Sequence, residues 1–339
     1  MSWYLESGEN SDVAINSKIE FTRNINGFKF DLSNKEDIER LENTIKDNLY
    51  KIGYGLKFLK LRDMDNITKM SLVEKGLITP KFLLNKNETG SILINDDENI
   101  CIMINDKDHL KIQVFNPGLD LKNALNLAIE VDQKIGDALE YSISKQYGYL
   151  TVVPTNVGTG LKASVKIHLP ALTMTRNVRK VLEIVTRFGI DIKGMYGEED
   201  DFYGRLYQVS NIQTLGITEN EIVNNLNMVV DKIIKQERAA RKMLLKNDLE
   251  LEDRIFRSYG ILTNCKKITS KEATKLYSDI KLGTDLGIID GLTDLKVLKL
   301  YEYTAPASLQ KYTGEQLDKI NRDVKRAEVI KQIILADEK

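Results

Sequence analysis

A glycine-rich segment is the first part of this sequence whose residue types suggest chemistry. Residues 148–172 read GYLTVVPTNVGTGLKASVKIHLPAL, which puts the loop Pro-Thr-Asn-Val-Gly-Thr-Gly between two predicted strands. Small residues and glycines allow backbone N–H groups to approach a phosphate or a carboxylate closely. An isolated Gly-x-Gly pair is, however, more often a tight turn between strands. The loop alone therefore leaves a phosphate-binding site and a plain turn open.

Charged residues elsewhere are equally ambiguous when each group is taken by itself. The acidic run at 199–201 is explained by a solvated loop as well as by a catalytic site. Arg322 and Arg326 are spaced i, i+4 on a predicted helix, which indicates either a solvated basic face or an anion-binding one. The apolar face of that helix is predicted to consist of Leu317, Ile320, Val324, Ala327 and Ile330.

The histidines and cysteines do not indicate a metal site. His168 falls on the polar face of a predicted strand, where an ordinary packed or surface histidine is the simpler interpretation, and His109 follows an aspartate in a short motif. Cys101 and Cys265 lie far apart and form no CxxC pair. No His, Cys and acidic residues have the spacing of metal ligands.

Several long motifs in a fixed order make the pattern specific. Besides the glycine-rich segment, the chain contains NSKIEFTRN (16–24), NDKDHLKIQ (105–113), KGMYGE (193–198) and YQVSNIQTLG (207–216). Together these resemble the ATP:guanidino phosphotransferases, the family of creatine and arginine kinases. The later segments resemble its protein-directed bacterial branch, the protein-arginine kinases, through ELEDRIFRSYGILTNC (250–265), LGTDLGIIDGL (282–292) and RDVKRA (322–327). The resemblance covers almost the whole chain.

The resemblance implies an enzyme that moves the γ-phosphoryl group of ATP onto a guanidinium nitrogen of a protein arginine, a tag for Clp-type degradation. Arginines suit the phosphates because a guanidinium donates two hydrogen bonds to one phosphate. Carboxylates orient the substrate guanidinium and draw a proton from its attacking nitrogen. ATP would arrive with Mg²⁺, and no further metal site is implied. The implied partners are a second copy in a homodimer, a zinc-binding activator protein, a Clp-type unfoldase and arginine-containing clients such as a heat-shock repressor.

The phosphate-binding positions of the family carry other residues in this chain. Four expected arginines are lysines (Lys18, Lys111, Lys162 and Lys193), and the fifth is Glu20. A histidine that the family uses near the nucleotide base is Gly76 here, and the cysteine before the Pro-Thr-Asn loop is Val153. The positions that the resemblance assigns to ATP binding are Asn16, Ser17, Lys18, Ile19, Glu20, Gly76, Lys111, Lys162, Ala163, Ser164, Val165, Lys166, Lys193, Gly194, Met195, Tyr196, Gly197 and Glu198.

The two catalytic carboxylate positions also differ from the family pattern. Lys107 occupies the position of one catalytic glutamate, and the other aligns best with Asp201 in the acidic run. Loss of a positioned general base costs roughly 10²–10⁴ in rate, and a cation in its place repels the substrate guanidinium. Glu20 is expected to repel phosphates, whereas lysine at an arginine position keeps the charge.

Two hypotheses follow from these substitutions. The first is a catalytically impaired pseudokinase that binds phosphoarginine or the partners of the kinase system. Its support is the family's phosphoarginine-binding motif, which is complete here as Arg322, Asp323, Arg326 and Ala327. The alternative is an active protein-arginine kinase in which lysines replace the phosphate-binding arginines.

Periodicity predicts the elements that position these residues. Residues 91–95 and 100–105 flank the polar DDEN and predict a hairpin, and residues 110–115 and 163–169 alternate as half-buried strands do. Hairpins this polar on one face favour an antiparallel sheet. A helix is predicted from about residue 119 to about Gln146.

The second half of the chain is predicted to become helical. Thr218 and Glu221 form a capping box that opens a helix, and a charge-dense stretch follows it. The fold class is therefore α+β. An antiparallel sheet flanked by helices, the guanidino-kinase catalytic fold that the resemblance implies, is expected over 1–254. A small all-helical domain for dimerisation and phosphoarginine binding is expected over 255–339.

Composition limits the remaining classes of function. The 339 residues carry a net charge of -1, which argues against direct nucleic-acid binding through overall basicity. No stretch approaches eighteen uncharged apolar residues, so a membrane span is not expected. The first residues contain no apolar run of the signal-peptide type, and a cytoplasmic protein is expected.

Overall fold

An eight-stranded sheet forms the centre of the part of the chain that this computed structural model describes, residues 2–32, 34–195 and 203–336. The strand order is β2-β3-β4-β5-β1-β8-β10-β9, and every neighbouring pair is antiparallel. The strands are β1 (Ala14–Arg23), β2 (Lys57–Lys60), β3 (Ser91–Ile94), β4 (Ile100–Ile104), β5 (Leu110–Pro117), β8 (Leu161–His168), β9 (Ile190–Gly194) and β10 (Leu206–Asn211). The predicted antiparallel sheet and the β3–β4 hairpin are confirmed.

Long helices cover one face of this sheet. They are α1 (Lys35–Ile52), α4 (Leu121–Ala138) and α7 (Glu219–Leu244). The side chains of strand β1 alternate between the two faces, and those on the helix-covered face are apolar. Ile19 and Phe21 are buried there in the main core, while Lys18 and Glu20 lie on the opposite face. Helix α7 begins at the predicted capping box, in which Thr218 and Glu221 exchange side-chain and backbone hydrogen bonds.

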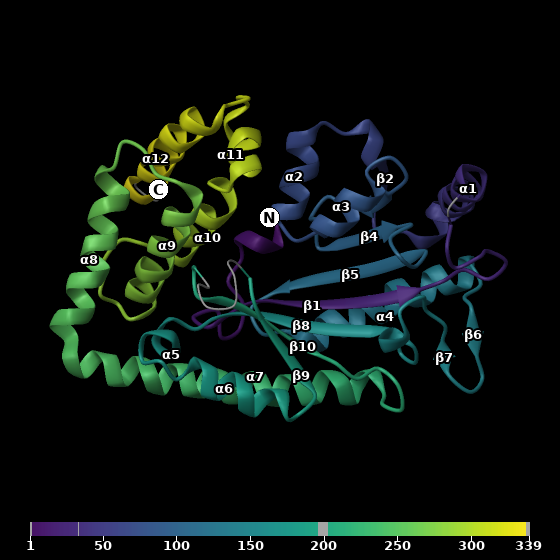
Figure 1. Cartoon of the computed structure of the whole chain (residues 1–339), viewed down its shortest axis with the longest axis horizontal. Helices are drawn as coiled ribbons and strands as arrows, with labels where there is room; N and C mark the ends of the chain where they lie inside the picture. Colours follow the sequence, from purple (N-terminus) through teal and green to yellow (C-terminus); the bar gives the residue numbers. More distant parts are fainter. Residues whose placement is uncertain (1, 33, 196–202, 337–339) are drawn as a thin grey trace.

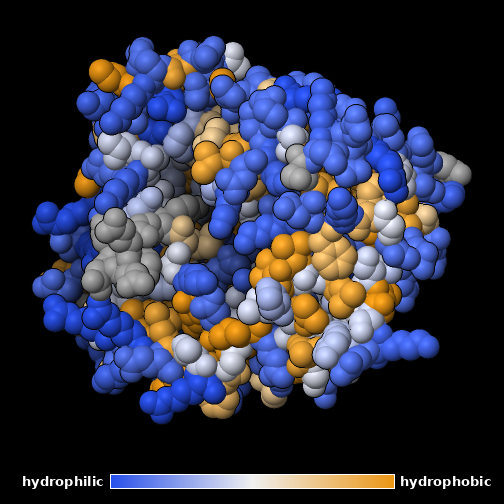
Figure 2. Space-filling view, turned by 45° about the vertical axis from the view of Figure 1, so that its right-hand side comes forward, coloured by the Kyte–Doolittle hydropathy of each residue, from blue (hydrophilic) through white to orange (hydrophobic). Residues whose placement is uncertain are grey.

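Within the described residues, helices cover the opposite face of the sheet at its β3–β5 side. Helices α2 (Asn66–Glu74) and α3 (Pro80–Lys86) and the N-terminal turn η1 (Trp3–Leu5) pack there around a small second core that includes Phe82 and Met103. Trp3 stacks on Phe115 of β5, with ring centroids 4.8 Å apart. The remaining strands present polar residues on this face. Figure 2 shows a hollow in the molecular surface that both hydrophilic and hydrophobic residues border.

The C-terminal part is a bundle of helices with its own core, which extends from Leu251 to Ile334. Its helices are α8 (Asp248–Asn264), α9 (Ser270–Asp285), α10 (Asp294–Tyr303), α11 (Pro306–Thr313) and α12 (Lys319–Leu335). Helix α7 runs along the sheet and leads through the short turn η4 (Leu245–Asn247) into α8, which carries the chain to the bundle (Figure 1). Short elements complete the chain: η2 (Leu61–Asp63), η3 (Pro154–Asn156), α5 (Pro170–Met174) and α6 (Val178–Thr186).

The helix predicted to reach Gln146 is shorter in the structure. Helix α4 ends at Ala138, and the chain then forms a separate hairpin of β6 (Ile143–Ser144) and β7 (Gly148–Tyr149). The cause is the packing of Tyr141, whose ring folds back on Gly136, where an added Cβ would lie 3.0 Å from the ring. Among the described residues, none of the helices has the length and apolar content needed to cross a membrane.

Candidate nucleotide and arginine site

The four substituted lysines lie on one face of the sheet. Glu20 is opposite Lys162 on β8 and opposite Gln113 on β5, while Lys18 and Lys111 are each two residues along the same strands. Side chains directly opposite each other in an antiparallel sheet share a face, as do residues two apart. Lys193 lies on the same face, because successive cross-strand neighbours share a face. The pairs are Lys193–Gln208, Gln208–Lys166 and Lys166–Asn16. The register therefore brings together side chains from five strands.

Glu20 forms the centre of an ion cluster on this face. Its carboxylate lies 2.7 Å from Nζ of Lys18 and 3.9 Å from Nζ of Lys111, and its side chain is only 12% exposed. Burial by itself would raise the pKa of Glu20, but Lys18, Lys111 and Lys162 lower it to about 2. Lys111 also pairs with Asp106 at 2.7 Å. Two of the cations that would face a phosphate are therefore already matched by carboxylates.

Gln113 connects the cluster to the turn that contains Gly76. Its Oε1 accepts a hydrogen bond from Lys18 Nζ at 2.6 Å, and its Nε2 donates to the carbonyl oxygen of Leu77 at 2.8 Å. Gly76 lies two residues beyond the end of α2 and has φ +75°, a conformation that favours glycine. Gly76 therefore lies one residue away from a direct contact of the lysine face. Sequence reasoning missed Gln113 and Asp106, although the alternation of β5 puts Gln113 on the same face as Lys111.

The turn that carries Lys107 is fixed by its neighbours. Asp108 Oδ1 accepts hydrogen bonds from Asn24 Nδ2 at 2.7 Å and from the Val152 N–H at 2.6 Å. His109 Nδ1 accepts from the Ile25 N–H, and Nε2 lies 2.8 Å from the Lys29 carbonyl oxygen, so His109 is a buried structural residue.

Lys107 itself projects from this turn. It is exposed and forms no hydrogen bond or ion pair within the described ranges. Burial lowers the pKa of neighbouring His109, which keeps that imidazole neutral near pH 7.

Several predicted nucleotide residues point to the helix-covered face instead. Ile19, Ala163 and Val165 belong to the main core. Ser17 Oγ donates to the Gly118 carbonyl oxygen and accepts from the Asp120 N–H, both at 2.9 Å, which anchors the start of α4. The alternation of β1 and β8 thus divides the predicted motifs, since Asn16, Ser164 and Lys166 share the face of the lysines.

The glycine-rich loop is a tight turn whose N–H groups are used within the protein. The N–H of Thr159 donates to the Thr214 carbonyl oxygen, and that of Gly158 donates to Tyr149. Gly158 has φ +111°, and an added Cβ would lie 2.4 Å from the Thr214 carbonyl oxygen. An added Cβ at Gly160 would lie 2.7 Å from the Thr22 carbonyl oxygen on β1. Close packing of two backbones therefore explains these glycines.

Part of the predicted site lies outside the described residues. This applies to Tyr196, Gly197, Glu198 and Asp201. Gly194 ends β9, and the Met195 N–H donates to the Leu206 carbonyl oxygen on β10. Lys193 is exposed and pairs with Asp191 at 2.8 Å. In the described part of the chain, no group of three or more His, Cys, Asp or Glu residues is arranged to hold a metal ion.

The Arg-Asp-x-x-Arg-Ala motif lies in α12, where the two arginines have different environments. Arg326 is 2% exposed; its Nε donates to the Thr304 carbonyl oxygen at 2.8 Å, and its Nη1 donates to Ile268 O at 2.9 Å and to Asp323 Oδ1 at 2.5 Å. Arg322 is half-buried and has no side-chain hydrogen bond within the described residues.

The apolar face predicted for α12 is therefore wrong in part. Ile320 is 66% exposed, whereas Asp323 and Arg326 are buried with Ala327 and Ile330. The physical reason is that the Arg326 head group finds two backbone carbonyls and a carboxylate inside the bundle, which compensates for its burial. Arg326 ties α12 to α10 and to the loop before α9.

Comparison with known proteins agrees with the fold and the motifs. Residues 30–240 match the family described as ATP:guanido phosphotransferase, C-terminal catalytic domain, and residues 248–339 match the protein-arginine kinase McsB C-terminal domain. Among solved structures, a duplicated taurocyamine kinase from Schistosoma mansoni superposes with a TM-score of 0.60 and 24% identity. That match covers 68% of this chain and 34% of the other, so this chain spans about a third of that protein. A lombricine kinase gives a TM-score of 0.58 at 22% identity, over 69% of this chain and 68% of the other.

These matches define the class of protein as an ATP:guanido phosphotransferase fold. More similar relatives narrow it. The chain is 41% identical to a protein-arginine kinase of Halothermothrix orenii, over 97% of this chain and 95% of the relative. It is 42% identical to a protein-arginine kinase of Listeria monocytogenes serotype 4a, over 98% and 96%. The chain belongs to the protein-arginine kinase family.

Proposed function

We propose that this chain is a protein-arginine kinase family member that recognises arginine-containing proteins but transfers phosphate to them poorly. The observation that carries the proposal is the position of Glu20 among Lys18, Lys111 and Lys162. A nucleotide phosphate approaching these lysines has to compete with a carboxylate that is part of the strand. The positive charge of the cluster is therefore partly compensated before any ATP arrives.

The turn at residues 105–109 supports the same proposal. Its exposed Lys107 stands where the family resemblance expects a catalytic glutamate. An ammonium group cannot accept the guanidinium proton, and it repels the substrate cation. Loss of a general base typically lowers the rate of catalysis roughly 10²–10⁴-fold. Each lost charge-assisted hydrogen bond to phosphate weakens binding by about 1.5–3 kcal/mol.

The proposed role is therefore recognition within a protein-arginine phosphorylation system. In this proposal the chain forms a homodimer and binds phosphoarginine through its C-terminal bundle. It also contacts a zinc-binding activator protein, a Clp-type unfoldase and clients such as a heat-shock repressor. ATP with Mg²⁺, where it binds, lies on the lysine face.

An active enzyme that uses lysines is the second candidate. Lys162 favours it, because Lys162 is exposed and has no hydrogen bond or ion pair within the described residues, so its charge is available to a phosphate. Lysine supplies a point charge but lacks the planar fork of arginine. In this candidate, a carboxylate at another position would accept the guanidinium proton, since Lys107 cannot.

Transfer from γ-labelled ATP to arginine on a denatured protein substrate separates the two candidates. We expect turnover at least ~10³-fold below that of an intact family member assayed in parallel, even with the activator protein present. Lys107→Glu alone should not restore activity, because Glu20 would still compensate Lys18 and Lys111. Turnover of the wild-type chain at the level of the intact relative would contradict the proposal and establish the lysine-based enzyme.

A further inference from the structure

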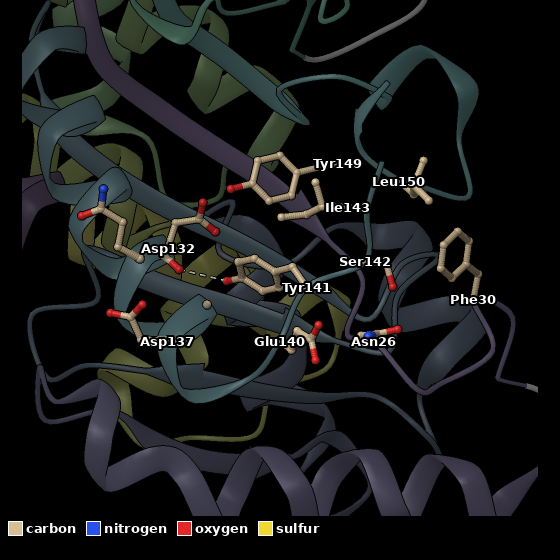
Figure 3. Close-up of a pocket in the computed structure, with 12 residues that line it drawn as sticks. Asn26, Phe30, Asp132, Asp137, Glu140, Tyr141, Ser142, Ile143, Tyr149 and Leu150 are labelled. Atoms are coloured by element: carbon tan, nitrogen blue, oxygen red, sulfur yellow. Dashed lines mark hydrogen bonds between the residues drawn. The ribbon is translucent and has the colours of Figure 1, made fainter. Parts of the chain in front are cut away.

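A pocket of about 610 Å³ opens between the C-terminal end of α4 and the β6–β7 hairpin, away from the lysine cluster. Its walls include Phe30, Tyr141 and Tyr149 and the carboxylates of Asp137 and Glu140. In Figure 3, Tyr141 lies between Tyr149 on one side and Asp137 and Glu140 on the other. The pocket thus combines aromatic rings with acidic groups.

The charge of the pocket is not compensated. Asp137 and Glu140 are exposed, and their side chains form no hydrogen bond or ion pair with the residues that the structure describes. No lysine or arginine is among the lining residues. The third carboxylate, Asp132, is 6% exposed and is bound to Arg23 at 2.7 Å. Two free carboxylates therefore face the opening.

The protein already uses these walls to hold one guanidinium. The Arg23 guanidinium carbon lies 3.5 Å from the Tyr149 ring centroid and 5.7 Å from that of Tyr141, behind the pocket wall. Asp132 receives hydrogen bonds from Arg23 Nε and Nη2. A cation over an aromatic ring, closed by a carboxylate, is a favourable arrangement. The outer part of the pocket offers the same two groups with no cation of its own.

The pocket is also close to the turn that carries Lys107. Asn24 Nδ2 donates to Asp108 Oδ1 at 2.7 Å and to the Leu150 carbonyl oxygen at 3.1 Å, and Leu150 lines the pocket. The Asn24 carbonyl oxygen accepts from the N–H of Ser142, another lining residue. A single side chain thus separates the pocket wall from the turn.

We propose that this pocket binds an arginine side chain of the client protein that flanks the arginine presented at the 105–109 turn. The inference rests on the proposed function in one respect, that the occupant comes from an arginine-containing client. A guanidinium suits the pocket better than an ammonium because its plane stacks on the rings while its N–H groups reach the carboxylates. The pocket thereby favours clients with two nearby arginines.

Binding of fluorescent peptides to the full chain, measured by anisotropy without ATP, tests this proposal. The peptides carry either one arginine or two, the second placed two to eight residues from the first, in a neutral background. We expect at least one two-arginine spacing to bind about tenfold more tightly than the one-arginine peptide. A second lysine should give a smaller gain.

The decisive variant is Asp137→Asn combined with Glu140→Gln, which keeps side-chain size at two exposed positions. Its matched control is Glu36→Gln combined with Asp97→Asn, which removes the same charge from exposed positions outside the pocket. The pocket variant should lose the two-arginine preference, and the control should keep it. Thermal unfolding of both variants should match that of the wild type.

The outcomes are separable from those of the proposed function. Equal binding of one-arginine and two-arginine peptides to the wild type, or equal loss in both variants, would overturn the pocket assignment. Because the readout requires no phosphoryl transfer, a fully active wild-type enzyme would contradict the proposed function and leave this test unchanged.

Discussion

At the scale of single residues, Glu20 decides what the lysine face offers to a ligand. Its carboxylate is held by Lys18 and Lys111, and its low pKa shows how strongly the cluster favours the ionised form. Lysine in place of arginine keeps a positive charge at each position. A glutamate at the centre lowers the net positive charge that such a set of cations would otherwise present.

Glu20→Gln should therefore bind ATP about tenfold or more tightly than the wild type, because Lys18 loses its ion pair and the carboxylate no longer repels the phosphates. The same change should lower the free energy of unfolding near pH 7 by on the order of 3 kcal/mol, from the pKa difference between 4.5 and about 2. Calorimetry and urea unfolding measure the two effects, with the exposed pair member Glu39→Gln as control.

The sign of the pH dependence follows from the depressed pKa. The stability that Glu20 contributes is fully present above pH 4.5 and is lost as pH falls through about 2.

The ATP-binding test has its own contradicting outcome. Unchanged ATP affinity in Glu20→Gln would mean that the carboxylate does not compete with phosphate on this face.

The two arginines of the Arg-Asp-x-x-Arg-Ala motif, Arg322 and Arg326, also differ in their environments. Arg326 donates to two carbonyls and to Asp323 inside the bundle, so Arg326→Ala should destabilise the protein by about 3–5 kcal/mol. Arg322 has no such bonds, and Arg322→Ala should change stability by less than about 0.5 kcal/mol.

Phosphoarginine binding is therefore best tested at Arg322. We expect Arg322→Ala to weaken binding of a phosphoarginine peptide by about 1.5–3 kcal/mol in calorimetry, without loss of fold. Equal binding to wild type and Arg322→Ala, with Arg326→Ala unfolded, would leave the motif with a purely structural role.

At the scale of elements, the sequence was informative wherever a local pattern determines structure. The β3–β4 hairpin follows from two apolar runs around DDEN, and the start of α7 follows from the Thr218–Glu221 box. The alternation along β1 places Lys18 and Glu20 on one face. These features depend on residues close together in the chain.

Features that depend on distant partners could not be read in this way. The end of α4 at Ala138 depends on Tyr141 packing against Gly136, which competes with further helix. The buried face of α12 is rotated because Arg326 finds carbonyls of residues 268 and 304. The Glu20 cluster needs the register of β1 with β5 and β8, which no local pattern gives.

At the scale of the whole molecule, the sheet and the helical bundle meet through a set of charged contacts. The Glu74 carboxylate at the end of α2 accepts hydrogen bonds from the N–H groups of Ala307 and Ser308, both at 2.8 Å, at the start of α11. Beside it, Lys75 lies 2.6 Å from Glu98 and 3.7 Å from Glu302 of α10. A small pocket of about 80 Å³ at this joint is lined in part by Glu302 and by Lys166 of the polar sheet face.

Glu302 makes this joint sensitive to pH. Burial raises its pKa to about 7; Lys75 and Lys166 oppose the rise, and Glu98 and Glu74 add to it. Lys75 forms its closer ion pair with Glu98, so its positive charge stabilises the ionised form of Glu302 only in part. Between about pH 4.5 and pH 7, Glu302 therefore holds its proton more firmly in the folded protein than in the unfolded chain.

The stability contributed by the neutral Glu302 carboxyl should fall as pH rises through this range, by on the order of 3 kcal/mol in total. Glu302→Gln, which cannot ionise, should be more stable than the wild type at pH 8. Its free energy of unfolding should also lack the part of the pH dependence that comes from Glu302. Trp3 is the only tryptophan and stacks on Phe115 near the joint, so its fluorescence during urea unfolding at pH 5, 6, 7 and 8 reports the change. Glu328→Gln on the exposed side of α12 is the control and should follow the wild type. If the free energy of unfolding of Glu302→Gln depends on pH as that of the wild type does, titration of Glu302 does not affect stability. The ion pairs around Lys75 would then stabilise the contact between sheet and bundle equally at every pH in the range.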